Sequence, residues 1–237
     1  MAKKLREGLI EPHDLGEEDL RSYMQTTYCG YMTEIRERII SFRHAQQVHA
    51  FNGGGLFGRK NVDTEFFGIQ VRMIMELLAY AVSTFEQASL GKPVTQKKRN
   101  IYQPTEILKS IKTQNLWIKS IDPNCNIFEA PNTEIEVRFI TTRYTTPANL
   151  TTDYGKLGNI LHAEQRPRID QNKKVQMSDI FMMFDRLELS VTKHIIGSKT
   201  ESWLIDTTQP GEDLGVSMYP LNLIEPNNQV DSKITAS

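Results

Sequence analysis

The chain has 237 residues, which is enough for one large domain or two small ones with a buried core. Its net charge of −1 excludes the broad positive field of a non-specific nucleic-acid binder. Two cysteines, Cys29 and Cys125, are too few for a disulfide framework or a four-ligand zinc site. We find no run of about eighteen apolar residues and no signal-peptide pattern, so we expect a cytoplasmic protein with no membrane contact.

Two long helices are predicted in the amino-terminal part of the chain. Over residues 17–50, apolar side chains recur at steps of three, four and seven, which indicates an amphipathic helix. Four glycines in NGGGLFGRKN (52–61) end it. A second helix is predicted over 66–88, with Asp63 or Thr64 as its N-cap. Apolar residues nearly encircle this second helix, so we expect it in the centre of the core.

The middle of the chain is predicted as an insertion followed by a third helix. Within the insertion 91–147, four X-Pro dipeptides divide residues 91–132 into loops and short elements. Within it, 133–144 alternates apolar and charged residues, as a half-buried strand does. After Pro147, apolar residues at helical spacing predict a third helix that ends near Leu161.

The carboxyl-terminal part is predicted as a fourth helix and two strands. The helix covers 178–197, with the serine at its start as N-cap and the glycine at its end as C-cap. Residues 201–208 and 215–224 read as two strands. The segment 226–237 is polar, and we expect it to be a disordered tail.

These elements predict a mainly α, α+β fold: a four-helix bundle with a small antiparallel β portion from the insertion and the C-terminal strands. We expect a single domain over 1–225. Its helical core covers about 17–90 and 148–197, its insertion 91–147, and its C-terminal strands 200–225.

Common catalytic motifs do not occur in the sequence. The glycine-rich loop reads Gly-Arg-Lys-Asn where a phosphate-binding loop needs Gly-Lys-Ser or Gly-Lys-Thr, and it follows a helix rather than a strand. The five histidines form no HExxH pair, and His44 and His49 are off a common helix face. There is no G-x-S-x-G serine elbow. We expect no metal and no cofactor.

A charged pair interrupts the apolar second helix. Arg72 and Glu76 are one turn apart and face the same polar line. Two interpretations stay open: a salt bridge within the helix at a partly exposed seam, or an arginine beside a cleft that takes an anionic substrate.

A histidine marks the predicted end of the third helix. His162 follows Leu161, and Lys156 precedes it with five residues between them. The negative end of a helix favours a cationic histidine, so this group can titrate near neutrality. Alternatively, His162 is a structural residue satisfied in the core.

The arrangement resembles the HEPN superfamily. Its members are helical bundles, often dimeric, and many are metal-independent ribonucleases with an arginine, four to six residues, and then a histidine near a helix end. Two long helices, an insertion and two further helices over roughly 17–195 match this order of parts. KLGNILH (156–162) has the motif's spacing with lysine in place of arginine, and RHAQQVH (43–49) has Arg43 and His49 with five residues between them.

Two functions follow from this pattern. The resemblance implies a protein that binds RNA or cleaves it in a bacterial defence or toxin setting, with the histidine handling a proton and a cation stabilising phosphate charge. The candidate residues are His162 and Lys156 for catalysis and Arg72, Glu76, Arg43 and His49 for substrate binding. The alternative is a non-enzymatic helical module that binds a protein partner or self-associates. The near-neutral charge and the missing catalytic motifs favour the alternative.

Overall fold

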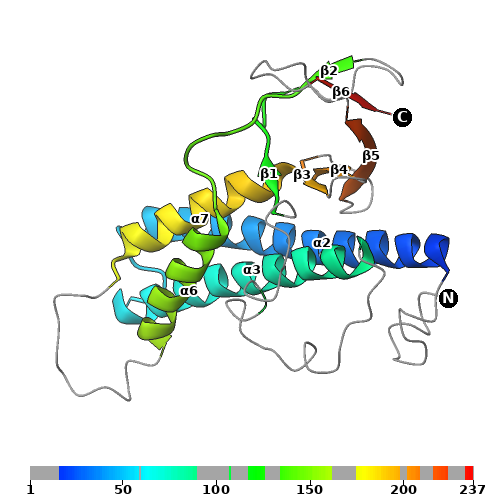
Figure 1. Ribbon diagram of the computed structural model, residues 1–237. Coiled ribbons are helices and arrows are strands. Elements are labelled where there is room, and N and C mark those ends of the chain that lie inside the picture. The colour runs from blue at the N-terminus through cyan, green and yellow to red at the C-terminus, as the bar shows by residue number, and fades with distance from the viewer. Residues whose placement is uncertain are drawn as a thin grey trace.

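Figure 1 shows the computed structural model, in which long helices lie together and an antiparallel sheet covers one part of them. The mainly helical α+β class predicted from the sequence is confirmed. The structure describes residues 16–58, 60–89, 107, 117–125, 134–161, 175–197, 202–208, 216–223 and 233–236.

Helices α2 (Glu17–Phe51) and α3 (Lys60–Ser89) lie side by side and run in opposite directions (Figure 1). Both long helices are confirmed, but α3 begins six residues before the predicted start at 66. The predicted cap of α3 is wrong, because the helix begins at Lys60 and includes Asp63 in its first turn. Thr64 also lies inside the helix, and its hydroxyl donates to the Lys60 carbonyl at 2.8 Å.

Helix α3 is the most enclosed helix of the described bundle. Helices α2, α6 (Pro147–Leu161) and α7 (Met177–Thr192) all pack against it. Its segment Val62–Glu86 is long and apolar enough to cross a membrane by composition alone, with mean hydropathy 1.3, and 56% of it is buried within the protein. Packing by three other helices accounts for this apolar composition.

Helix α6 begins at Pro147, as predicted. The Thr146 hydroxyl oxygen accepts the backbone N–H of Asn149 at 3.1 Å, so Thr146 caps the helix. Proline suits the first position because its missing N–H would have no helical partner there. The helix continues to Leu161, where the described segment ends.

Helix α7 differs from the prediction at both ends. At its start, the Asp179 carboxylate accepts the backbone N–H of Gln176 at 2.9 Å, while Ser178 lies inside the helix. At its end, the helix stops at Thr192 and the chain continues as strand β3 (Lys193–Gly197), so Gly197 is not a C-cap. The prediction failed here because Ile195 fits the helical stripe, but Ile195 and Ile196 are buried on opposite sides, as in a strand.

The sheet has the strand order β1-β3-β4-β5-β6-β2, and every pairing among these strands is antiparallel. The remaining strands are β1 (Lys119–Ser120), β2 (Glu134–Glu136), β4 (Ser202–Asp206), β5 (Ser217–Leu223) and β6 (Lys233–Ala236). Strands β4 and β5 confirm the two C-terminal strands. Within the predicted strand 133–144, β2 is short, and Phe139 forms a single bridge with Ile121.

The predicted disordered tail over 226–237 is wrong at Lys233–Ala236, which pairs with β5 and β2. An edge strand offers unpaired backbone N–H and C=O groups. A polar segment can therefore join a sheet through backbone hydrogen bonds, which composition does not reveal.

An aromatic cluster holds the helices together near the α2–α3 turn. The rings of Phe42 (α2) and Phe184 (α7) stack with centroids 3.7 Å apart, and Phe67 (α3) meets Phe42 edge-on at 4.9 Å. Phe181 (α7) completes the cluster, with its ring edge-on to Phe67 at 5.2 Å. Such ring pairs add to the free energy gained by burying their area.

A buried histidine joins the sheet to the bundle. The Tyr28 hydroxyl of α2 lies 2.7 Å from Nε2 of His194 in β3, and Nδ1 of His194 lies 3.1 Å from the Val191 carbonyl. Because the carbonyl only accepts, Nδ1 carries the proton and Nε2 accepts from Tyr28. Both residues are fully buried. Burial lowers the pKa of His194 from 6.5 to about 4.

Protonation of His194 should therefore destabilise the fold. Its pKa is lower in the folded state, so its contribution is complete above pH 6.5 and is lost as the pH falls toward 4. The shift corresponds to roughly 3 kcal/mol of unfolding free energy. Urea unfolding from pH 7 to pH 4 measures it, with His194→Gln as the variant that cannot titrate. Equal pH dependence in both proteins would contradict this role.

Candidate functional site

The α2–α3 turn contains the glycine-rich segment singled out in the sequence. The amide of Gly54 donates to the His49 carbonyl at 2.8 Å, which closes the end of α2. Gly53 and Gly54 have φ values of +67° and +92°, a conformation that residues with a Cβ rarely adopt. The glycines thus allow the chain to reverse between two antiparallel helices.

A buried carboxylate fixes this turn from within. Asp63 is fully buried, and its two oxygens accept the backbone N–H groups of Leu56 at 3.0 Å and Phe57 at 2.8 Å. Nε2 of His49 lies 3.9 Å from the same carboxylate. Hydrogen bonds to a charged acceptor are stronger than neutral ones, so Asp63 holds the turn in one conformation.

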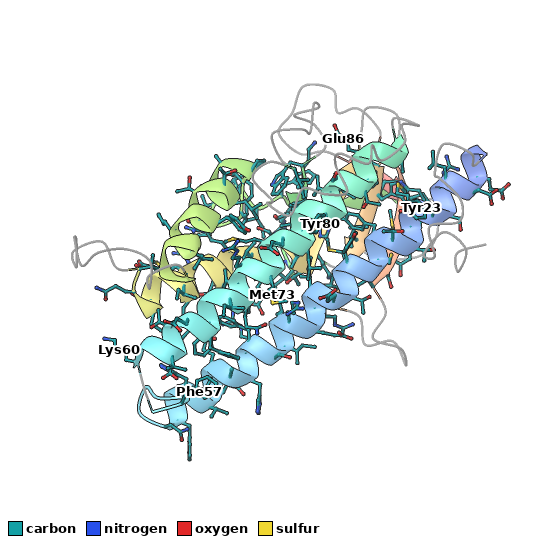
Figure 2. All side chains as sticks on the ribbon, turned by 90° about the horizontal axis from the view of Figure 1, so that it is seen from below. Tyr23, Phe57, Lys60, Met73, Tyr80 and Glu86 are labelled. Carbon is teal, nitrogen blue, oxygen red and sulfur yellow. The ribbon has the colours of Figure 1, made fainter. Side chains whose placement is uncertain are left out.

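Apolar side chains project from the fixed turn. Phe51 is 91% exposed, Phe57 is 54% exposed and Val62 is 40% exposed. We call these three residues the turn patch. Figure 2 shows Phe57 and Lys60 at one end of the bundle, with Tyr23 and Glu86 toward the other. All three residues lie in or next to the α2–α3 turn, and apolar side chains that are exposed beside one another are typical of interaction sites.

The predicted substrate residues Arg43 and His49 belong to different local networks. Arg43 forms ion pairs with Asp185 at 2.9 Å and with Glu188, and its guanidinium lies over the Phe184 ring at 4.7 Å. His49 packs edge-on against Phe67, with ring centroids 5.6 Å apart, beside Asp63. The structure therefore does not bring these two side chains together as a cation and a base.

Arg72 and Glu76 form the predicted salt bridge within α3, with Nε 3.2 Å from Oε1. This confirms the first of the two interpretations left open by the sequence. Tyr154 of α6 completes a closed network: Arg72 Nη2 donates to its hydroxyl at 2.5 Å, and the hydroxyl donates to Glu76 at 2.8 Å. Arg72 also lies over the Tyr154 ring at 4.4 Å. Burial and the Glu76 carboxylate raise the pKa of Tyr154 to about 12, so the hydroxyl stays protonated.

The predicted catalytic lysine lies away from this network. Lys156 is 54% exposed, and its Nζ lies 3.8 Å from Asp153 on the side of α6 that carries the ion pair to α7. Arg72 instead contacts the Tyr154 side of α6. The structure thus separates Lys156 from Arg72. His162 lies outside the described residues.

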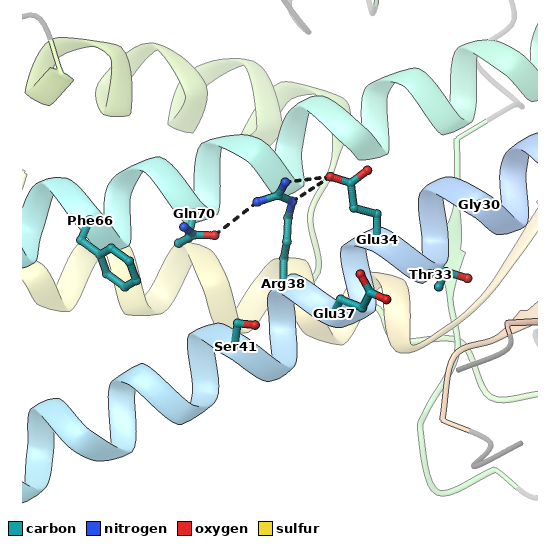
Figure 3. A pocket seen from close by; sticks show the side chains of 8 residues that line it. All are labelled: Gly30, Thr33, Glu34, Glu37, Arg38, Ser41, Phe66 and Gln70. Carbon is teal, nitrogen blue, oxygen red and sulfur yellow. Dashed lines mark hydrogen bonds and ion pairs between the residues drawn. The ribbon is translucent and has the colours of Figure 1, made fainter. Parts of the chain in front are cut away.

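A groove of about 610 Å³ runs between α2 and α3 (Figure 3). Arg38 spans it: Nη2 donates to Glu34 at 2.7 Å, and Nη1 lies 3.4 Å from the Gln70 side-chain oxygen. Glu37 also lines the groove. Because Arg38 is already paired and two carboxylates are nearby, this groove is unsuited to an anionic substrate.

Sequence reasoning missed two residues that shape these sites. Tyr154 falls among the apolar positions of the predicted third helix, and Asp63 is predicted only as a helix cap. For Tyr154, the signal is a tyrosine on a stripe that faces a helix with a charged pair. For Asp63, no local signal shows that its carboxylate will bind the preceding turn.

Within the described part of the chain, no three or more His, Cys, Asp or Glu side chains are grouped to hold a metal ion. No protein-family model, curated protein or solved structure matches the chain. The function is therefore inferred from the geometry of this protein alone.

Replacing Asp63 with Asn should loosen the turn. An amide nitrogen then faces one of the two backbone N–H groups, so we expect a loss of about 2 kcal/mol in unfolding free energy. Hydrogen exchange at the Phe57 amide should also become faster. Glu65→Gln, an exposed change two residues along, is the control and should leave both unchanged. An unaltered Phe57 amide in Asp63→Asn would contradict the role of Asp63.

Proposed function

We propose that this chain is a non-enzymatic interaction module that binds a protein partner through the turn patch. The observation that carries the proposal is the exposure of Phe51 and Phe57 on a turn that Asp63 holds in place. A fixed turn loses little conformational entropy when it binds. Aromatic side chains are also the usual energetic anchors of protein interfaces.

The shape of the turn favours one kind of partner. The α2–α3 turn lies at one end of the bundle, where two helices form a hairpin (Figures 1 and 2). Two such hairpin ends that meet bury little area. A partner with an apolar groove can instead enclose Phe51 and Phe57, and buried area with good shape complementarity is what stable interfaces require. The proposed occupant is therefore a groove on a different protein.

The charges of the bundle support a role in binding over catalysis. Arg43 is paired with two carboxylates, and Arg72 is enclosed by Glu76 and Tyr154. Both guanidinium groups would have to leave these partners to grip a phosphate. Breaking such charged hydrogen bonds costs free energy that catalysis would have to recover.

Site-specific photocrosslinking at residue 57 tests this function. We expect a defined protein to crosslink there and not at residue 40, an exposed isoleucine position elsewhere on α2. The purified partner should then bind the wild type and bind Phe51→Ser/Phe57→Ser at least about tenfold more weakly, since buried aromatic anchors contribute ≥2 kcal/mol. Ile40→Ser should retain full affinity.

Three outcomes would overturn the proposal. The first is equal crosslinking at both positions, and the second is unchanged affinity in the double variant. The third is patch-dependent binding to lipid vesicles, measured by flotation, or to a second copy of the chain, measured by light scattering.

The second candidate is a metal-independent ribonuclease. The observation that favours it is the exposed Lys156, whose ammonium is only loosely held by Asp153 at 3.8 Å and can turn toward a phosphate. Its proposed base is His162. This candidate predicts that the wild type cleaves labelled RNA in EDTA and that His162→Ala loses this activity by at least about a hundredfold. Equal cleavage by both proteins, or none by either, removes His162 from such a role.

A further inference from the structure

One long side of α3 stays partly exposed after α2, α6 and α7 have packed against the helix. Its apolar segment Val62–Glu86 is 56% buried within the protein. Five apolar side chains on the exposed side recur at steps of three and four residues, so they form one stripe along the helix. These residues, which we call the α3 stripe, are Phe66, Ile69, Met73, Leu77 and Tyr80. Ile69 is 41% exposed, and the other four are half-buried.

The groove between α2 and α3 runs beside this stripe. Its α2 wall carries the small residues Gly30, Thr33 and Ser41, and its α3 wall carries Phe66 and Gln70 (Figure 3). A Cβ placed on Gly30 would meet no atom within 4 Å, so this wall is open to solvent. Gly30 and Ser41 lie roughly 16 Å apart along α2, or about three helical turns. A groove of this length suits an elongated ligand rather than a compact one.

Unpaired carboxylates border the stripe on both sides. Glu37 lines the groove on the α2 side. Glu65 precedes Arg72 by one heptad and therefore lies on the opposite border, toward α6. Both glutamates are exposed, and among the described residues neither forms an ion pair. Arg38 and Arg72, the arginines beside the stripe, are each paired with a glutamate one turn away on their own helix. The surface around the stripe is therefore negative.

We infer that the α3 stripe and its groove bind a basic amphipathic helix of a partner protein. Helices that dock in grooves present apolar side chains at i, i+3 or i+4 and i+7, which matches the spacing of the stripe. Lysines or arginines that flank those positions pair with Glu37 and Glu65. A second copy of this chain is a poorer occupant, because it would bring the same unpaired carboxylates together, and like charges at an interface cost free energy.

This surface is separate from the turn patch. In Figure 2, Met73 and Tyr80 lie along α3, whereas Phe57 lies at the end of the bundle. The two surfaces approach each other at Phe66, whose ring centroid lies 5.4 Å from that of Phe57. Substitutions at Ile69, one turn further along α3, therefore leave the turn patch intact. The inference does not rest on the proposed function, and either can fail without the other.

Binding of a designed peptide tests the site. The probe is a helix of about 18 residues with leucines at heptad positions a and d and lysines at e and g, and its counterpart has glutamates at e and g. In fluorescence anisotropy, we expect the wild type to bind the lysine peptide at least about tenfold more tightly than the glutamate peptide. Ile69→Ser should weaken binding of the lysine peptide by about tenfold, because it removes a buried apolar anchor. Glu37→Lys/Glu65→Lys should reverse the preference between the two peptides.

Two variants are matched controls. Met182→Ser removes an apolar side chain that is 55% exposed on α7. Glu18→Lys/Asp19→Lys reverses two charges at the start of α2, away from the groove. Both should bind the lysine peptide as the wild type does. A thermal melt of each variant verifies that it is folded.

Three outcomes would overturn the inference. The first is the absence of saturable binding of the lysine peptide. The second is a loss of affinity in Glu18→Lys/Asp19→Lys as large as that in Glu37→Lys/Glu65→Lys, which would indicate a non-specific attraction between opposite charges. The third is a dimer of the purified chain that Ile69→Ser dissociates in light scattering, since the stripe would then hold a second copy.

Discussion

The burial of α3 against three other helices is the constraint on which the rest of the structure depends. A helix that is apolar on nearly every side must be covered, and α2, α6 and α7 together cover it. The polar line of α3 can be enclosed only if its charges find partners. Glu76 and the Tyr154 hydroxyl meet this need for Arg72, and they also fix how α6 lies on the core.

This constraint determines where function can reside. Arg43 and Arg72 link helices to one another, so they serve the packing of the bundle. The surfaces left for partners are those that packing does not use. One of them is the α2–α3 turn with the exposed Phe51 and Phe57. Binding to a groove on a partner protein is proposed for this surface.

Periodicity predicted the helices well because each depends on residues close in sequence. It placed the helix starting at Pro147 and the long helix ending near Ala50. It failed at Lys193, where a helical stripe continues but pairing with β4 converts the chain to a strand. It also failed for the partners of Asp63 and Arg186, because hydrogen bonds and ion pairs between elements depend on packing that spacing does not encode.

A double-mutant cycle between Arg72 and Tyr154 tests the central claim most directly. The unfolding free energies of Arg72→Met, Tyr154→Phe and the double variant are compared with that of the wild type. If α3 is enclosed through this network, the two changes are coupled by about 1 kcal/mol or more. Additivity within roughly 0.5 kcal/mol would show that α6 does not dock on α3 through these side chains and would contradict the account.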